Sequence, residues 1–546
     1  MSTSRKSFTR SLIHPDGRGR RLRRWGGIAF VASAALIATT LTASLAQAQL
    51  PIRSVGATTA TAPTTVTPRS AVAAKATTGR VRGNFRPANT KIPAFRPTMG
   101  KAAYAAAKAA AGRAAHIAKP AAVRRLAPPN VIGQNFAGTD QPTACGCLPP
   151  DTHGAVGPSH YLQIVNSRMV VYNKSTNAIL KAASLNSFFG YTQAGSTLLF
   201  DPRAAYDPVW NRFVLTADSF LDANNNQYFF IAVSKTADPT GAWWIFKLLI
   251  NGSNSAVFFD YPQLGMDNGA ILVTANVFGT GGNVGTAYFF KKSALYNGLS
   301  FNYWRFGKLA PWTIAATTVL DYNATTFEVS APGSGAFITK FGFKDTDRDP
   351  PALTQNVNIP VASYSMPPNA RQPGTAATLD TLDSRFVDRS TQTSSSIFNT
   401  HTIALGSFPA PKFYEFNTLS NTVVRSGFYF ASGTSDDWNA SIAANRSREV
   451  FVTWSSTDSP VGVKPQVRVS GNQPADAGSI PAGTAVATST DVYTSGSPQR
   501  WGDYSSTTLD PSAVTGCAAN RRAWGTNETV IAGPTWGTQI TRFGFC

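Results

Sequence analysis

Residues 201–250 read DPRAAYDPVWNRFVLTADSFLDANNNQYFFIAVSKTADPTGAWWIFKLLI. Four runs of strand length, rich in aromatic and β-branched residues, alternate here with turns of Asp, Asn, Pro and Gly; the runs are 204–206, 213–217, 228–233 and 243–248. The spacing is too short and too rich in turn residues for helices, so it predicts four antiparallel strands joined by hairpins. One such sheet leaves two apolar faces uncovered, so we expect similar sheets beside it.

Similar openings, an Asp followed by a strand-like run, recur along the chain. Five copies are clear and two, at 321 and 383, are weaker; together the anchors are Asp151, Asp201, Asp260, Asp321, Asp383, Asp437 and Asp503. The mean spacing of about 59 residues is close to the size of a four-stranded propeller unit. The sequence therefore predicts an all-β fold over residues 131–546, a β-propeller of seven four-stranded blades, with six blades as the alternative.

The net charge of +21 lies entirely near the N-terminus. Residues 1–130 contain 22 Lys or Arg and one acid, whereas residues 131–546 contain 27 basic and 27 acidic residues. Residues 1–48 combine an arginine-rich start, an apolar Ala-rich stretch and the sequence Ala46-Gln47-Ala48, which is typical of a cleaved signal peptide. An N-terminal membrane anchor is the alternative. We expect a secreted monomer, extracellular or associated with the cell envelope.

Residues 49–130 form a low-complexity segment with 14 basic residues and no acid. It has too few large apolar residues to form a core, so we expect a disordered tail, although the alanines of residues 101–119 favour a helix. One interpretation is a linker or cleaved propeptide. The other is a tail that binds polyanions such as cell-wall polymers, anionic lipid or extracellular nucleic acid. No pattern of specific nucleic-acid recognition accompanies the charge.

Four cysteines flank the repeats: Cys145, Cys147, Cys517 and Cys546. In a secreted chain this number favours disulfides. The last repeat has room for about three strands, so residues 131–136 are predicted to supply its fourth strand. We expect disulfides between the N-terminal and C-terminal cysteines to lock this closure, although the pairing within the four does not follow from the sequence.

The repeated Asp residues have two interpretations. Each carboxylate can accept backbone N–H bonds in a tight turn before a strand. Alternatively, a ring of these acids binds Ca²⁺ at the mouth of a central channel, with the ligands Asp151, Asp201, Asp260 and Asp503. Repetition in every unit is typical of a folding element, so the structural interpretation is favoured. We expect no other cofactor.

Residues that are not repeated at this rim are the better candidates for binding. They are His153, Arg203, Tyr261, Arg385, Arg389, His401, Trp438, Arg500, Trp501 and Tyr504. Arginines and aromatic side chains in a concave mouth suit an anionic ligand or a sugar. The alternative is that each arginine pairs with a neighbouring rim Asp.

Motif searches find no Gly-x-Ser-x-Gly, His-Glu-x-x-His or phosphate-binding glycine loop. The segments PPDTHGAVG (149–157), FDYP (259–262) and RWGDYS (500–505) resemble a family of secreted bacterial β-propeller proteins of unassigned activity. This family is similar in layout to sialidase-like propellers. The resemblance implies a secreted propeller over residues 140–546 and transfers no catalytic residue. The Ser-x-Asp-x-Gly-x-x-Trp box of sialidases is absent.

Three functions follow from these observations. The first is a non-enzymatic module that binds glycans or cell-envelope polymers, and it predicts a solvent-exposed aromatic strip. The second is a sialidase-like or other glycan-cleaving enzyme. It predicts that Arg203, Arg385, Arg500 and Tyr261 or Tyr504 converge in the channel mouth. The third is a structural surface protein, which predicts a plugged mouth.

Overall fold

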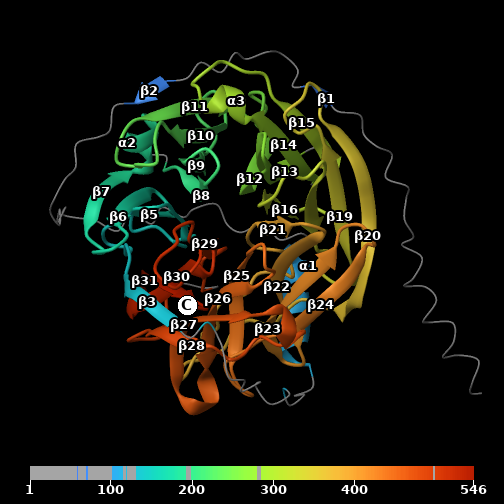
Figure 1. The fold of residues 1–546 in the computed structure, drawn as a ribbon. Helices are drawn as coiled ribbons and strands as arrows, with labels where there is room; N and C mark the ends of the chain where they lie inside the picture. The colour runs from blue at the N-terminus through green and yellow to red at the C-terminus, as the bar shows by residue number, and fades with distance from the viewer. Residues whose placement is uncertain are drawn as a thin grey trace, which may run out of the picture. The chain divides into compact units, whose positions relative to one another are not determined.

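The computed structural model describes residues 58–59, 69–71, 101–114, 119, 129, 131–191, 198–279, 284–495 and 499–546. Nearly all regular structure in them is β (Figure 1). The predicted signal peptide, residues 1–48, lies outside the described residues. Within the described ranges, no helix has the length and hydropathy that a membrane span requires.

The stretch 201–250 forms the predicted antiparallel sheet. Its strands are β8 (Phe200–Asp207), β9 (Arg212–Asp218), β10 (Tyr228–Ser234) and β11 (Trp243–Leu249), paired in chain order. Side chains alternate between the two faces of the sheet. Val214 and Phe229 pack on one face with Ile271, and Leu215 packs on the other with Ile164. Both faces are therefore covered by other sheets, as the apolar character of the runs predicts.

Six further groups of four antiparallel strands follow the same pattern in the described chain, and we call each group of four an array. The first three of these are β4 (His153–Val156), β5 (His160–Val165), β6 (Arg168–Asn173) and β7 (Ile179–Ser184); β12 (Val257–Met266), β13 (Ala270–Gly279), β14 (Val284–Lys291) and β15 (Trp304–Leu309); and β16 (Ile314–Ala315), β18 (Thr326–Ser330), β19 (Gly335–Lys344) and β20 (Ala352–Tyr364).

The other three arrays complete the chain. They are β21 (Ser390–Thr393), β22 (Ser396–Leu405), β23 (Phe408–Asn417) and β24 (Thr422–Phe428); β25 (Asp436–Ala444), β26 (Val450–Asp458), β27 (Val463–Asn472) and β28 (Thr484–Thr488); and β29 (Ser506–Leu509), β30 (Arg522–Ala532), β31 (Thr535–Gly544) and β3 (Val131–Ala137).

Short strands connect some of these arrays. β17 (Thr317–Val319) follows β16 after one residue and pairs in parallel with β12 and β21, so those two arrays share a ten-stranded sheet. β1 (Thr58–Thr59) pairs with β15, and β2 (Arg69–Ala71) pairs with β11. The weak anchor Asp321 was misplaced, because it follows β17 instead of opening a strand.

One strand from each of six arrays, together with β17, contacts the next in a cyclic series. These inner strands are β4, β8, β12, β17, β21, β25 and β29, and β29 in turn contacts β4. All seven contain polar residues that are buried. Six arrays thus contact their neighbours through an inner strand of their own, and β17, which contacts β18, takes this place for the array of β16, β18, β19 and β20.

The chain ends meet by strand pairing, not by the predicted disulfide lock. β3 pairs with β31, so residues 131–137 supply the fourth strand of the last array. The disulfides are Cys145–Cys147 and Cys517–Cys546, whose Cα atoms lie 5.1 and 5.5 Å apart. The prediction of disulfides between N-terminal and C-terminal cysteines is therefore wrong, because each cysteine has a partner within its own end of the chain.

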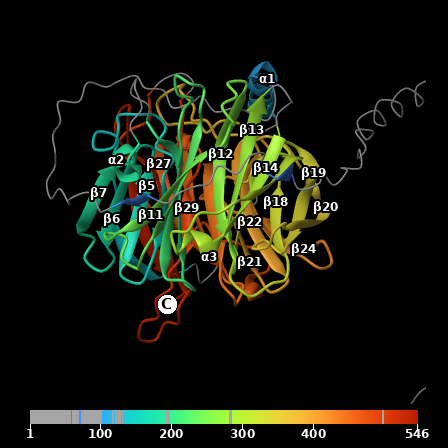
Figure 2. The same cartoon turned by 90° about the horizontal axis from the view of Figure 1, so that it is seen from above.

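The few helices are short. They are α1 (Lys101–Gly112), α2 (Leu185–Phe189) and α3 (Lys292–Leu295), with the 3₁₀ turns Ser459–Val461 and Pro474–Asp476. Figure 2 shows α1 at the upper end of the strands and α3 toward the lower end. Residues 101–112 were predicted to lie in a disordered tail. They instead form α1, as their alanines favour, and Tyr104 donates a hydrogen bond to Asp380 at 3.0 Å.

Candidate functional site

Four predicted rim residues converge: Arg203, Tyr261, Arg385 and Tyr504. The guanidinium carbon of Arg203 lies 3.4 Å from the ring centre of Tyr504 and 5.7 Å from that of Tyr261. The guanidinium carbon of Arg385 lies 4.5 Å from the ring centre of Tyr261, and the two tyrosine rings meet edge to face at 6.2 Å. We call these four residues the arginine–tyrosine cluster.

This cluster is closed to solvent. Arg203 and Arg385 are each 1% exposed, and Tyr504 is fully buried. Arg203 Nε donates to the carbonyl oxygen of Pro262 at 2.9 Å, and its Nη1 donates to that of Val387 at 3.1 Å. The convergence that the enzyme hypothesis predicts is present in part, because Arg500 pairs with Asp503 instead of joining the cluster. The side chains that do converge fill the space that a ligand would occupy.

Two predicted rim arginines pair with rim acids. Arg385 donates from Nε and Nη2 to the two carboxylate oxygens of Asp383, at 2.7 and 2.9 Å. Arg500 Nη2 donates to Asp503 Oδ1 at 2.7 Å. Bidentate and charge-assisted bonds of this kind hold a guanidinium in one orientation. These pairs correspond to the alternative in which rim arginines balance the repeated acids.

His153 lies beside the cluster as a neutral imidazole. The backbone N–H of Ala204 donates to His153 Nδ1 at 3.2 Å, so the ring proton is on Nε2 and points at Asp388 Oδ1, 3.1 Å away. Burial lowers the pKa of His153 to about 4, although Asp388 works against this shift. The ring therefore links β4, β8 and the segment before β21.

Two other predicted rim residues lie in apolar cores. The ring of His401 packs against Phe386 and Tyr414, with centres 5.0 and 5.4 Å away, and burial lowers its pKa to about 3. Trp438 packs edge to face on Trp501 at 5.5 Å. Neither side chain reaches the arginine–tyrosine cluster through a hydrogen bond in the described residues.

The acids proposed as Ca²⁺ ligands accept protein hydrogen bonds. Asp151 accepts from the backbone N–H of Asp503 and from Asn166 Nδ2, both at 2.6 Å, and Asp201 accepts from the backbone N–H of Tyr261 at 3.0 Å. Burial and Asp503 raise the pKa of Asp151 to about 7. Burial also raises the pKa of Asp201, and the nearby carboxyl of Asp260, another proposed ligand, raises it further. These bonds join neighbouring arrays, and no metal-ligand group of three occurs in the described ranges.

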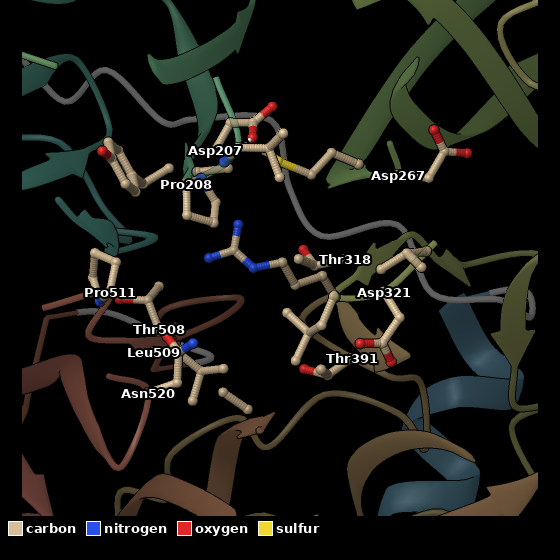
Figure 3. Close-up of a pocket in the computed structure, with 18 of the residues that line it drawn as sticks. Asp207, Pro208, Asp267, Thr318, Asp321, Thr391, Thr508, Leu509, Pro511 and Asn520 are labelled. Atoms are coloured by element: carbon tan, nitrogen blue, oxygen red, sulfur yellow. Dashed lines mark hydrogen bonds between the residues drawn. The ribbon is translucent and has the colours of Figure 1, made fainter. Parts of the chain in front are cut away.

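An open cavity of about 370 Å³ lies at the other end of the inner strands. Every inner strand contributes to its wall, through Val156, Ala205, Met266, Thr318, Thr391, Ile442 and Thr507. Figure 3 shows Pro208, Thr508 and Pro511 across the cavity from Thr318 and Thr391. This volume is within the range of small-molecule sites.

Most charged groups in the cavity wall are paired. Lys292 Nζ lies 2.6 Å from Asp207 Oδ2, and Arg446 Nε lies 2.8 Å from Asp321 Oδ1. Asp267 accepts hydrogen bonds from two backbone N–H groups and two threonine hydroxyls. The three carboxylates of the wall are thus held by the protein itself.

Large side chains at this cavity are exposed. Tyr322 is 85% exposed and Val209 is 67% exposed, and both line the cavity; Trp210, beside Val209, is 40% exposed. Exposed apolar side chains that gather beside a concavity mark it as a candidate binding site. Together with the amides of Asn268 and Asn520, these groups offer an amphipathic binding surface.

The open cavity lies at the end of the inner strands opposite to the residues that the sequence singled out. The repeated acids drew attention to the start of each strand. Of the predicted residues, only Arg389 lines the cavity. Tyr322 was visible only as part of a weak repeat, because its exposure depends on how seven strands end together.

No family model and no curated protein matches the chain. The similar solved structures include the neuraminidase-like protein of subtype N10 from A/little yellow-shouldered bat/Guatemala/060/2010, at 9% identity and a TM-score of 0.34, over 59% of this chain and 91% of that chain.

Two further similar structures are described as a sialidase and a galactanase. Trypanosoma rangeli sialidase, solved with sialic acid, aligns at 9% identity and a TM-score of 0.33, over 64% of this chain and 56% of that chain. An exo-β-1,3-galactanase from Phanerochaete chrysosporium, solved with galactose, aligns at 8% identity and 0.30, over 72% and 92%. TM-scores of this size carry no conclusion about the function of this chain.

Proposed function

We propose that the chain is a secreted β-propeller module that binds a glycan or cell-envelope polymer in the open cavity. The observation that carries this proposal is a concave site, lined by all seven inner strands, beside the exposed ring of Tyr322. Aromatic rings cover the apolar faces of ligands, and nearby amides and hydroxyls satisfy their polar groups.

The propeller itself is part of this proposal. Seven arrays, the cyclic order of contacts among inner strands and the pairing of β3 with β31 support a ring of seven blades. Two disulfides and the export pattern of residues 1–48 support an extracellular location.

Binding is favoured over cleavage by the state of the cavity carboxylates. A glycosidase requires a pair of carboxyl groups, one to donate a proton and one to attack or activate water. Asp207, Asp267 and Asp321 line the cavity, and each is committed to protein donors. A glycosidase would need carboxyl groups that are not engaged by protein donors, and the three carboxylates that line this cavity are all engaged.

A glycan array and a panel of fluorogenic glycosides, both applied to the full secreted chain, test this function. We expect array binding without hydrolysis. Tyr322→Ala should weaken binding about tenfold, or 1.4 kcal/mol, because it removes the exposed ring. Leu419→Ala is the matched control, since Leu419 is 78% exposed and lies outside the cavity. Hydrolysis of a glycoside would support a glycan-cleaving enzyme. No binding and no hydrolysis would support a structural surface protein.

A further inference from the structure

The inference concerns Arg389, which is 7% exposed and lines the cavity. Its Nη1 donates to the carbonyl oxygen of Ala204 at 2.8 Å. Its backbone N–H donates to Asp388 Oδ1 at 2.8 Å. A guanidinium has five N–H donors. Among the described residues, no acceptor meets Nε or Nη2, so donors of a fixed cation are available at the cavity wall.

Behind Arg389, one carboxylate, that of Asp388, lies among several basic side chains. Asp388 is the carboxylate shared by this group: Arg203 Nη1 lies 3.6 Å from its Oδ1, and His153 donates to the same oxygen. His153 is neutral because burial lowers its pKa to about 4. Asp388 is therefore shared by the two guanidinium groups, and Arg203 also interacts electrostatically with the carboxyls of Asp201 and Asp218. Arg203 Nη2 and Asp388 Oδ2 are also buried without a partner in the described chain.

The remaining cavity charges do not supply the missing anion. The carboxylates of Asp207 and Asp321 pair with Lys292 and Arg446, and Asp267 accepts four neutral donors. A buried cation without a counterion is costly, and an anion from outside would lower that cost.

A second polar group of the cavity wall also lacks a hydrogen-bond partner. Thr508 lines the cavity and is 9% exposed, and its hydroxyl has no hydrogen-bond partner in the described residues. A hydroxyl donor and a guanidinium edge suit the oxygens of a carboxylate or a phosphate. A neutral sugar would leave the guanidinium uncompensated.

We infer that the cavity binds an acidic saccharide, with the oxyanion of the ligand seated on the free edge of Arg389. This inference rests on the proposed function and specifies its ligand class. The oxyanion can come from a uronate carboxylate or from a sugar-linked phosphate, because both present paired oxygens to a guanidinium.

The test compares trigalacturonate with its carboxyl-reduced form, α-1,4-galactotriose, by titration calorimetry on the full secreted chain. We expect the acid to bind about tenfold or more tightly, since charged hydrogen bonds contribute this much. Inorganic phosphate and a poly(glycerol phosphate) oligomer form the second arm. Tighter binding of these ligands than of trigalacturonate would assign the oxyanion to phosphate.

Arg389→Gln should remove the preference for the acid and retain weak binding of the neutral trisaccharide. Arg389→Lys should retain part of the preference and serves as the folding control, with the unfolding temperature of each variant measured. Arg113→Gln, which removes an exposed charge outside the cavity, should bind as the wild type does.

The outcomes separate the two proposals. Equal affinity for the acidic and neutral trisaccharides would overturn the inference and leave glycan binding in place. A preference that survives Arg389→Gln would overturn the role of Arg389. If none of the four ligands bound, the inference would be overturned. If the glycan array also showed no binding, the proposed function would be overturned as well.

Discussion

At the scale of single residues, the interior of this protein contains carboxyl groups in unusual environments. Asp218 is fully buried, and neither of its carboxyl oxygens has a hydrogen-bond partner among the described residues. Burial raises its pKa well above the usual value, and Asp201 and Asp260 add to the shift. The folded protein therefore holds Asp218 protonated at a pH at which the unfolded chain has lost that proton.

Stability should consequently depend on pH through Asp218. A carboxyl whose folded pKa is raised stabilises the fold fully below its unfolded pKa, near 4, and this contribution is lost as pH rises toward the folded pKa. Asp218→Asn removes this dependence. We expect the variant to exceed the wild type in unfolding free energy at pH 8, with the smallest difference near pH 4.

Denaturant unfolding at several pH values checks this prediction. Asp347→Asn is the control, because that carboxylate is 46% exposed, and the variant should follow the wild type at every pH. A gain for Asp218→Asn that does not change between pH 4 and pH 8 would show that the carboxyl is ionised or hydrogen-bonded in the folded protein.

At the scale of elements, the basic segment before the repeats is partly bound to them. Lys119 Nζ lies 3.2 Å from Asp437 Oδ2, and both side chains are fully buried. Lys119 also donates to the carbonyl oxygen of Ser435 and lies 4.7 Å from the ring centre of Phe408. In α1, Lys108 donates to Thr381 Oγ1 at 2.7 Å. Two of the segment's cations are therefore unavailable to a polyanion.

The buried pair predicts a strong coupling between Lys119 and Asp437. Lys119→Met should lower the unfolding free energy by about 3–5 kcal/mol, because it leaves a buried carboxylate without its cation. Adding Asp437→Asn should recover much of this loss. A double-mutant cycle measured by denaturant unfolding gives the coupling energy. Additive effects of the two changes would contradict the pairing.

At the scale of the whole molecule, the closing contact is the pairing of β3 with β31. Asn135 pairs with Thr541, and Phe136 pairs with Ile540. Proline at both 135 and 136 should disrupt this ladder at a cost of about 3 kcal/mol or more, and expose the edge of β31 to aggregation. Light scattering and thermal unfolding measure both effects.

The Cys517–Cys546 disulfide provides the comparison. It closes a loop of 29 residues inside the last array, so replacing both cysteines by serine should cost roughly 3 kcal/mol and cause no aggregation. If the serine variant aggregated and the proline variant did not, the assignment of closure to β3 would be wrong.

Much of the architecture follows from local sequence patterns. Hairpin turns and alternating runs predicted β9, β10 and β11 to within one residue at each end, and the later part of β8, because strand period and turn chemistry act over a few residues. The shortage of residues after Asp503 predicted that 131–136 would join the last array. The positions of Asp321 and the disulfide partners were not predictable, because they depend on contacts between distant segments.

The sequence by itself determined that the repeats form antiparallel sheets and that residues 131–136 join the last of them, since both depend on short-range periodicity and chain length. Only the tertiary structure decided which end of the inner strands is open. Arg203, Arg385, Tyr261 and Tyr504 fill one end because seven strands bring their side chains together, and they bury one another there. The other ends of the same strands surround the cavity beside Arg389 and Tyr322.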